Sequence, residues 1–443
     1  MTNISESIIP INELPKGWIL SPISSLAKFN PAAINGNYPH KSIEYLDIAN
    51  VSSGSYGNPT TLQLEDAPSR AKRIVVDNDV ILSTVRPGNR AYAYMHDVKP
   101  NLIVSTGFVV LQATNSDSRY LYYIVTSNPV IDYLASIAEE KTAYPSVNPS
   151  DIEEIIVPVP PLSEQRAIAH ILGTLDDKIE LNRRMNETLE GIARALFKSW
   201  FIDFDPVRAK AEGRQPFGMN EETAALFPDQ FEDSELGEIP KGWKIGSIYD
   251  IAEVQYGAPF SSKLFNNEGA GLPLVRIRDL ESCNPDIFTL ERIERDTVVH
   301  AGDILVGMDG EFKVTTWYGP NSLLNQRVCM FVPKDNVPRF YLKYILEKPI
   351  SFFERSKVGT TIIHLCKSDI DIIRVLVPNH RILSCYNTLT NNLYNIILYN
   401  HNQNNILMCI RNLLLPKLIS GEIRIDPSRF GFGPEENKAV EVQ

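Results

Sequence analysis

The chain has 443 residues, more than one hydrophobic core ordinarily supports, so the sequence predicts two or more domains. Apolar residues make up 43% and charged residues 22%, which is typical of globular proteins and argues against overall disorder. Lys and Arg number 43 against 54 Asp and Glu, so the formal net charge is −11. This balance excludes a uniformly basic, histone-like DNA coat, although it permits local contact with nucleic acid.

Cysteine usage and the N-terminus indicate the compartment. The five cysteines all lie in the second half, their number is odd, and none form a Cys-x-x-Cys pair. This pattern argues against a disulfide framework and a structural zinc site, and the seven histidines show no ligand spacing. The N-terminus lacks a basic stretch before an apolar core, and no apolar run approaches the ~18–20 residues of a membrane helix. We therefore expect a cytoplasmic protein without bound metal.

The chain repeats itself. Glu-Leu-Pro-Lys-Gly-Trp at 13–18 recurs as Glu-Ile-Pro-Lys-Gly-Trp at 238–243. Later pairs match at similar offsets, among them Asp-Ile at 151–152 and again at 369–370. A shared offset over many positions predicts two copies of one unit of roughly 220 residues. Each copy is expected to be a globular part followed by a long helix.

The globular parts are expected to be mixed α/β (α+β) with several short strands. Strand-like segments occur at 79–83 and 108–111 in the first copy and at 303–306 and 328–332 in the second. The loops between them are rich in Gly, Asn, Thr, Tyr and Arg. The segment between the copies is polar and broken by prolines, which favours a linker with a short helix at 221–226.

Apolar and Asn positions spaced by three and four residues predict a coiled-coil seam in each long helix. Buried Asn in such a seam costs stability and fixes register, although Asn facing solvent is the alternative. We expect the two helices to pair antiparallel, with the globular parts at opposite ends of a rod. The seam positions are Leu175, Ile179, Asn182, Asn186, Leu189, Ile192 and Leu196, and then Leu393, Ile397, Asn400, Asn404, Leu407, Ile410 and Leu414.

Motifs at the helix ends carry a family resemblance. Pro-Leu-Ser-Glu-Gln-Arg-Ala-Ile at 161–168 precedes Leu-Asp-Asp-Lys-Ile at 175–179. Leu-Leu-Pro-Lys-Leu-Ile-Ser-Gly-Glu-Ile at 414–423 ends the second helix. With the doubled Pro-Lys-Gly-Trp, the chain resembles the specificity subunits of type I restriction-modification enzymes over nearly its whole length.

The resemblance implies a non-catalytic DNA-reading subunit with two target recognition domains and an antiparallel coiled coil. Each domain would read one half of a split, asymmetric double-stranded DNA site, and helix length would set the unread gap. Two methyltransferase subunits would dock on the helices and bring S-adenosylmethionine. Restriction subunits would add ATP-driven translocation and Mg²⁺-dependent cleavage, while this chain would bind no cofactor and no membrane.

The expected boundaries follow from the repeat. They are the first recognition domain at 1–160, the first coiled-coil helix at 161–200, a linker at 201–237, the second recognition domain at 238–379, the second coiled-coil helix at 380–420 and a tail at 421–443. The second helix departs from the first, because it is Asn-rich and carries His-Arg-Ile at 380–382 where the first has Ser-Glu-Gln at 163–165.

Residues that read bases should lie on loops after strands, with Arg or Lys on guanine and Asn or Gln on adenine. A solvated surface charge is the alternative for any single Arg. We regard Asn325-Gln326-Arg327 as the best base-reading segment. The full candidate set is Arg86, Asn89, Arg90, Ser105, Thr106, Lys141, Thr142 and Tyr144 in the first domain and Arg276, Arg278, Lys313, Asn325, Gln326, Arg327, Thr360 and Thr361 in the second.

Two other classes of function stay open at this point. Asp303, Glu311 and Lys313 form a pattern that holds a metal ion in some nucleases, but the first copy does not repeat it. A purely structural coiled-coil scaffold is the second alternative. Such a scaffold needs no Arg-rich or Asn-rich loops at matching places in two domains.

Overall fold

The computed structural model describes residues 7–140, 145–356 and 363–433. Among the sequence-predicted DNA contacts, Lys141, Thr142, Tyr144, Thr360 and Thr361 fall outside these ranges. The chain divides into two compact units. Unit 1 consists of the residues up to 178 together with those from 406 onward, and unit 2 consists of residues 179–405. Unit 1 therefore combines two segments that lie far apart in the sequence, whereas unit 2 is one continuous stretch.

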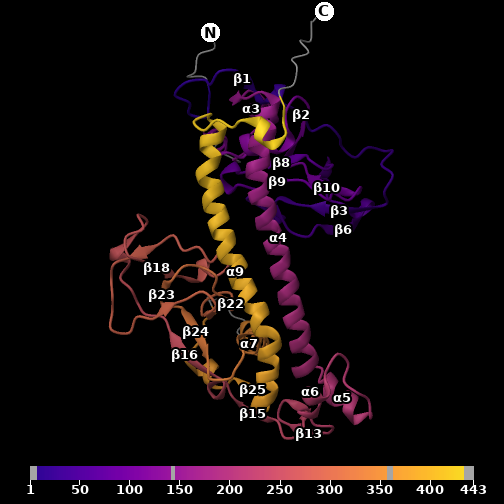
Figure 1. The fold of residues 1–443 in the computed structure, drawn as a ribbon, viewed down its shortest axis with the longest axis vertical. Helices are drawn as coiled ribbons and strands as arrows, with labels where there is room; N and C mark the ends of the chain where they lie inside the picture. The colour runs from indigo at the N-terminus through magenta and orange to yellow at the C-terminus, as the bar shows by residue number, and fades with distance from the viewer. Residues whose placement is uncertain (1–6, 141–144, 357–362, 434–443) are drawn as a thin grey trace, which may run out of the picture. The chain divides into compact units, whose positions relative to one another are not determined.

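Unit 1 contains short strands in layered sheets and three helices of its own (Figure 1). Two four-stranded sheets have the orders β6-β3-β10-β7 and β2-β11-β8-β9, and β1 pairs with β12. The strands are β1 (Ile19–Pro22), β2 (Ala27–Phe29), β3 (Ser42–Leu46), β4 (Val51–Ser52), β5 (Ser55–Tyr56), β6 (Thr60–Gln63), β7 (Ala71–Ile74), β8 (Val80–Ser83), β9 (Tyr92–Tyr94), β10 (Leu102–Ser105), β11 (Phe108–Ala113) and β12 (Ile156–Val159), and the helices are α1 (Ser118–Val125), α2 (Asn128–Glu140) and α3 (Pro149–Glu153).

Unit 2 repeats this plan. Its sheets have the orders β17-β19-β18-β23-β20 and β16-β24-β21-β22, and β15 pairs with β25 as β1 does with β12. The strands are β13 (Phe231–Ser234), β14 (Gly237–Pro240), β15 (Lys244–Ser247), β16 (Ala252–Tyr256), β17 (Phe265–Asn266), β18 (Leu272–Val275), β19 (Phe288–Thr289), β20 (Val298–Val299), β21 (Ile304–Gly307), β22 (Val314–Thr316), β23 (Ser322–Leu324), β24 (Val328–Pro333) and β25 (Arg374–Val377), and the helices are α5 (Asp205–Ala211), α6 (Glu221–Ala225), α7 (Arg339–Ser356) and α8 (Lys367–Asp371).

The matching sheet orders confirm the internal repeat and the mixed α/β class. The second copy of the Pro-Lys-Gly-Trp motif enters β15 just as the first enters β1. The parallel pair β3 and β10 recurs as β18 and β23, with Tyr45 opposite Ile103 and Leu274 opposite Leu323. The buried strands consist of nearly continuous runs of Val, Ile and Leu. This composition is typical of strands that are buried on both faces of a sheet.

Two long helices, α4 (Leu162–Phe201) and α9 (His380–Ile419), pack together within each unit (Figure 1). In unit 1, Arg411 of α9 bonds Asp176 of α4, and Ile168 lies in the same apolar cluster as Leu418. The two helices therefore run antiparallel in this unit. In unit 2 the order is the same, because Asn182 bonds Asn404 and the Tyr386 hydroxyl donates to the Ala193 carbonyl. The expected antiparallel pairing is confirmed.

Pro416 does not end α9, which continues to Ile419. A proline near the end of a helix removes only its own N–H donor, and the turn can continue past it. The stop comes at Gly421, whose φ of +75° is the left-handed conformation of a helix C-terminus. A side chain at this position would also collide with Pro15, whose Cγ would lie 2.4 Å from the added Cβ.

The segment predicted as a linker is folded in the structure. It contains α5, α6 and the β13–β14 hairpin, and the predicted short helix corresponds to α6. Phe204 and Phe227 of this segment pack with Trp200 of α4 and Trp243 in one aromatic core. Proline and polar residues favoured a linker in the sequence, but these two aromatic anchors bury the segment against the helix end.

Two matched positions of the predicted seam, Ile192 of α4 and Ile410 of α9, are exposed in the structure. In unit 2, Asn182, Asn186 and Ile397 are buried, but Ile192 is 46% exposed and Ala193 takes its place in the core. In unit 1, Ile410 is 40% exposed. Four residues further along each helix, Leu196 and Leu414 again pack against the apolar clusters.

Candidate nucleic-acid interface

In unit 1, three loops meet at one edge of the sheets. The loop after β8 donates from the Thr84 N–H to the Gly107 carbonyl in the β10–β11 turn, at 2.8 Å. The same loop donates from the Arg86 N–H to the Pro145 carbonyl, at 2.9 Å. These bonds hold the ends of three chain segments together. We call this set of loops edge 1.

Unit 2 builds the same junction. The Met308 N–H after β21 donates to the Arg327 carbonyl in the β23–β24 turn at 2.8 Å, and the Gly310 N–H donates to the Ile363 carbonyl at 3.1 Å. We call these loops edge 2. The two edges therefore share a backbone frame although their side chains differ.

Edge 1 brings only part of the predicted set to the surface. Arg86 and Asn89 are exposed on the turn after β8, and the Arg86 backbone has the left-handed φ of 45°. Among the described residues, the structure gives the Arg86 guanidinium no partner. Arg90 differs, because its guanidinium bonds Asn128 at 2.6 Å and Asp132 at 3.0 Å on α2. Arg90 is thus engaged within the domain.

The β10–β11 turn contains one exposed and one buried candidate. Ser105 is completely buried, and its hydroxyl accepts from the Gly107 N–H at 3.3 Å. Thr106 is exposed, and its N–H donates to the Arg70 carbonyl. Burial removes Ser105 from the residues that we carry forward as DNA contacts. Arg70, exposed at the same turn, was not anticipated, because it lies before a strand rather than after one.

Of the basic candidates Arg276, Arg278 and Lys313 at edge 2, one side chain is paired within the domain and two are exposed. The guanidinium of Arg276 bonds Asp279 at 2.8 Å, which raises the pKa of Arg276, and it also bonds Asp286. Its side chain is engaged inside the domain. Arg278 and Lys313 are exposed. Arg278 follows Ile277, which would contact a side chain at Gly307 at the end of β21.

The residues of the segment Asn325-Gln326-Arg327, which the sequence favoured for base reading, differ in their burial. Asn325 is buried, its Oδ1 accepts from the Gln326 N–H, and its backbone forms a bridge with Ala258. Gln326 and Arg327 are exposed on the turn. Asn325 therefore shapes the turn, while its two neighbours point their side chains outward.

The nuclease pattern does not form a site. Asp303 precedes β21 and its Oδ2 accepts from the His300 N–H, whereas Glu311 follows the other end of that strand. Four residues of extended strand between them span about 13 Å, so the two carboxylates cannot share one metal ion. Within residues 7–140, 145–356 and 363–433, no cluster of three His, Cys, Asp or Glu side chains could hold a metal.

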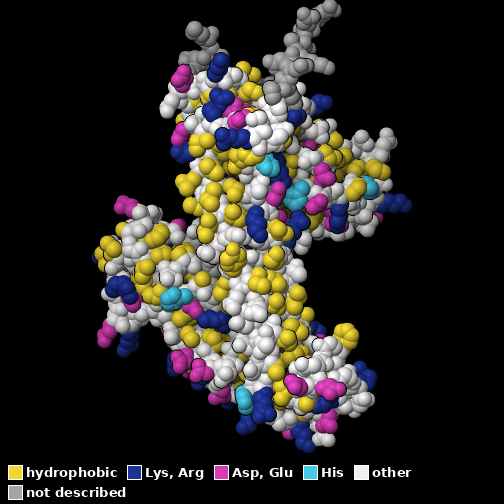
Figure 2. All heavy atoms as spheres, viewed as in Figure 1, with side chains coloured by type: hydrophobic (Ala, Val, Ile, Leu, Met, Phe, Trp, Pro, Cys, Tyr) yellow, Lys and Arg dark blue, Asp and Glu magenta, His cyan; other side chains and the backbone are white. Residues whose placement is uncertain are grey.

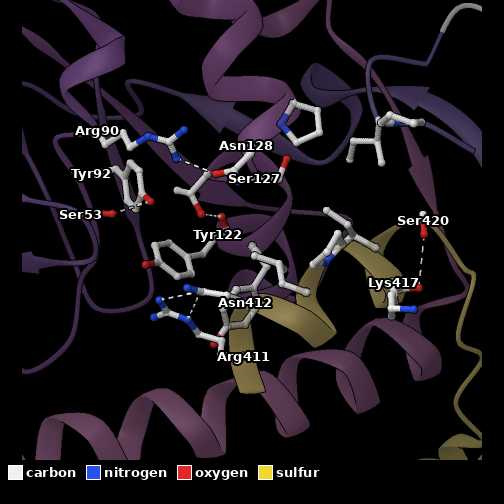
Figure 3. A pocket seen from close by; sticks show the side chains of 18 of the residues that line it. Ser53, Arg90, Tyr92, Tyr122, Ser127, Asn128, Arg411, Asn412, Lys417 and Ser420 are labelled. Carbon is white, nitrogen blue, oxygen red and sulfur yellow. Dashed lines mark hydrogen bonds between the residues drawn. The ribbon is translucent and has the colours of Figure 1, made fainter. Parts of the chain in front are cut away.

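Unit 1 also contains a cavity of about 630 Å³ between the recognition domain and the last turns of α9 (Figure 3). Its wall includes Arg90, Tyr122, Arg411 and Lys417. Figure 3 shows the Arg90 side chain turned toward Asn128. The cations of the wall are paired inside the protein, Arg411 with Asp176 and Lys417 with Glu422, so the cavity has little free positive charge.

Comparison with known proteins decides the family. The model of the type I restriction modification DNA specificity domain matches twice, over residues 15–191 and 240–405. The chain belongs to the type I restriction-modification DNA specificity family. It is the DNA specificity subunit of a type I restriction-modification system, a non-catalytic subunit, and the two matches coincide with the two repeats.

Relatives support this placement over nearly full length. The specificity subunit of the type I restriction enzyme HindI from Haemophilus influenzae is 26% identical, with 87% of this chain and 95% of the relative covered. The MjaIX specificity subunit from Methanocaldococcus jannaschii is 27% identical, with 94% and 96% covered. The crystal structure of the type I restriction-modification S subunit from M. genitalium has a TM-score of 0.53 at 15% identity and covers 92% of this chain and 98% of that one, which shows a shared fold. The described part of this specificity subunit has no helix long and apolar enough to cross a membrane.

Proposed function

We propose that each edge of the specificity subunit reads one half of a split, asymmetric DNA site. The observation that carries this proposal is the common backbone frame of the two edges with different side chains on it. A reader of two unlike half-sites needs a repeated scaffold and divergent contact residues. Each good bidentate contact to a base would discriminate by ~1–3 kcal/mol.

The exposed polar residues at each edge are the proposed contacts. At edge 1 they are Arg86, Asn89 and Thr106. At edge 2 they are Arg278, Lys313, Gln326 and Arg327. The buried or internally paired candidates position these loops, because their hydrogen-bonding groups are already occupied.

We also propose that methyltransferase subunits dock on α4 and α9. Apolar side chains remain exposed along single faces of these helices, on which residues three, four or seven positions apart lie together (Figure 2). Monomeric proteins seldom expose such stripes, which favours a protein partner. The exposed apolar residues are Leu181, Met185 and Ile192 of α4 and Leu389, Ile396, Tyr399, Ile406, Ile410 and Leu413 of α9.

The net charge of −11 fits a subunit that leaves part of the phosphate contact to its partners. Counterion release from phosphates supplies much of the affinity of DNA-binding proteins. We therefore expect the isolated chain to bind DNA weakly. The partner subunits would supply S-adenosylmethionine, and in a restricting complex ATP and Mg²⁺, and the antiparallel helices would set the unread spacer.

The test maps methylated adenines across a genome after co-expression of the subunit with its methyltransferase. The wild type should give one split motif. Arg86→Ala should degrade only one half of it and Gln326→Ala only the other half. Lys28→Ala serves as the control, since Lys28 lies exposed on β2, opposite Gln112 at the far end of β11 from edge 1. Methylation that does not depend on this subunit would overturn the proposal.

A further inference from the structure

Edge 2 carries a charged triad. The Nε atom of Arg327 lies 3.3 Å from Oδ2 of Asp309, and the Nδ1 atom of His364 lies 2.5 Å from Oδ1 of the same carboxylate. The Asp309 side chain is 22% exposed, while those of His364 and Arg327 are 47% and 57% exposed. The carboxylate is thus the inner member, and the guanidinium is the one most open to a ligand.

The fold does not need this triad. In unit 1 the three positions hold Gly107, Val85 and Ser146. The Thr84 N–H still donates to the Gly107 carbonyl, and Val85 bridges Ser146 as Asp309 bridges His364. The junction in unit 1 therefore forms without any charged side chain, so the charges at edge 2 are not required by the shared backbone frame.

The backbone conformation of Arg327 also favours a binding role for this residue. Its φ of 74° lies in the left-handed region, where a side chain is disfavoured and glycine or asparagine is common. The counterpart in unit 1, Gly107, does not have a positive φ, so this conformation is particular to edge 2. Residues held in this region against their preference cluster at binding sites.

The pairing also presents the guanidinium in a defined way. The Asp309 carboxylate pairs with the Nε atom of Arg327. Among the described residues, the two terminal nitrogens of Arg327 have no ion-pair or hydrogen-bond partner. Such a fork matches the O6 and N7 acceptors of guanine in the major groove. The contact also neutralises Asp309, whose charge would otherwise repel a DNA phosphate.

We infer that Arg327 reads a guanine in the half-site of edge 2, and that Asp309 and His364 are positioning residues that aim it. This inference rests on the proposed function, because it assumes that edge 2 faces DNA bases. Beyond that function, the inference specifies the base as guanine, the group that contacts it as the Arg327 guanidinium, and the residues that orient this group as Asp309 and His364.

The experiment uses the complete chain assembled with its methyltransferase subunits. Methyl transfer is measured on duplexes in which each guanine of the edge 2 half-site is replaced singly by 7-deazaguanine, which lacks the N7 acceptor. For the wild type, one position should lose 10- to 100-fold in kcat/KM, as expected for a lost bidentate contact. Arg327→Ala should show a similar loss on unmodified DNA and no further loss with the analogue at that position.

The positioning role has its own readout. Asp309→Asn should lower the discrimination between guanine and 7-deazaguanine at that one position at unchanged Tm, and Asp309→Glu should restore part of it. Lys334→Ala is the control, since Lys334 lies beyond the opposite end of β24 and should leave discrimination intact. An Arg327→Ala complex that still senses the analogue would overturn the inference, as would a half-site without guanine on either strand. A wild type that gives no split motif would instead overturn the proposed function.

Discussion

At the scale of single residues, buried polar groups tie distant segments of one unit together. Glu164 at the start of α4 is buried, and its carboxylate accepts from the Trp18 indole at 2.9 Å and from Arg424 at 2.7 and 2.8 Å. The doubled Pro-Lys-Gly-Trp motif thus has a structural role in unit 1. The first turn of α9 contains no acidic residue, so only the start of α4 carries such a carboxylate.

A partly buried histidine predicts a pH dependence of stability. His401 of α9 stacks on Tyr318 with ring centroids 3.7 Å apart, and burial lowers the pKa of His401 below 6.5. Nearby Glu190 opposes this effect and Lys343 adds to it. As pH falls through 6.5, the unfolded chain gains a proton that the folded chain resists, so stability falls. The stability contributed by neutral His401 is therefore present above about pH 6.5 and lost below it.

The measurement compares Tm at pH 7.5 and 5.5. His401→Phe keeps the stacked ring and removes the titration, so it should lose less Tm on acidification than the wild type. His380→Phe is the control, because His380 is exposed at the start of α9. An acid loss in His401→Phe equal to that of the wild type would refute the assignment.

At the scale of elements, the paired helices contain a polar ladder. In unit 2 the Asn400 amide donates to Asn186 at 2.8 Å, and the Asn182 amide donates to Gln403 and Asn404 at the same distance. The sequence predicted these Asn in the seam because both repeats place them at the same spacing. It could not predict that Ala193 is buried in place of Ile192, because the core that encloses Ala193 is built from segments distant in the sequence.

Substitution of the Asn186–Asn400 pair should be strongly non-additive. Asn400→Leu alone leaves the Asn186 carbonyl oxygen buried without its donor, at a cost of about 1–3 kcal/mol. Asn186→Leu does the same to Asn400. The double variant to Leu replaces both partners by apolar groups and should be far less destabilised than the sum of the two. Urea unfolding of the four proteins gives the coupling, and simple additivity would contradict a paired role.

The chemistry of the edges was only partly visible in the sequence. The repeat located the matching loops, and residues such as Arg86 and Gln326 could be named from their type. The triad of Arg327 with Asp309 and His364 could not, since its members come from three loops whose contact depends on the folded junction. Ser105 and Asn325 were named for their side-chain type, although turn geometry buries both.

At the scale of the whole molecule, each compact unit includes the end of the long helix that belongs to the other sequence repeat. Unit 1 takes Leu418 and Ile419 of α9 into its core, and unit 2 takes Phe197 and Phe201 of α4. The aromatic residues Phe197, Trp200 and Phe201 at the end of α4 thus belong to the core of unit 2. The repeat predicted two similar domains but not this exchange of helix ends, because pairing between distant segments leaves no local pattern.

The central claim is that each unit reads its own half of the DNA site. The most direct test replaces residues 238–379 with the corresponding segment of a specificity subunit whose half-sites are known, and maps the methylated motif with the partner methyltransferase. We predict that one half of the motif changes to that of the donor and that the other half stays as in the wild type. A motif that changes in both halves, or in neither, would contradict the account.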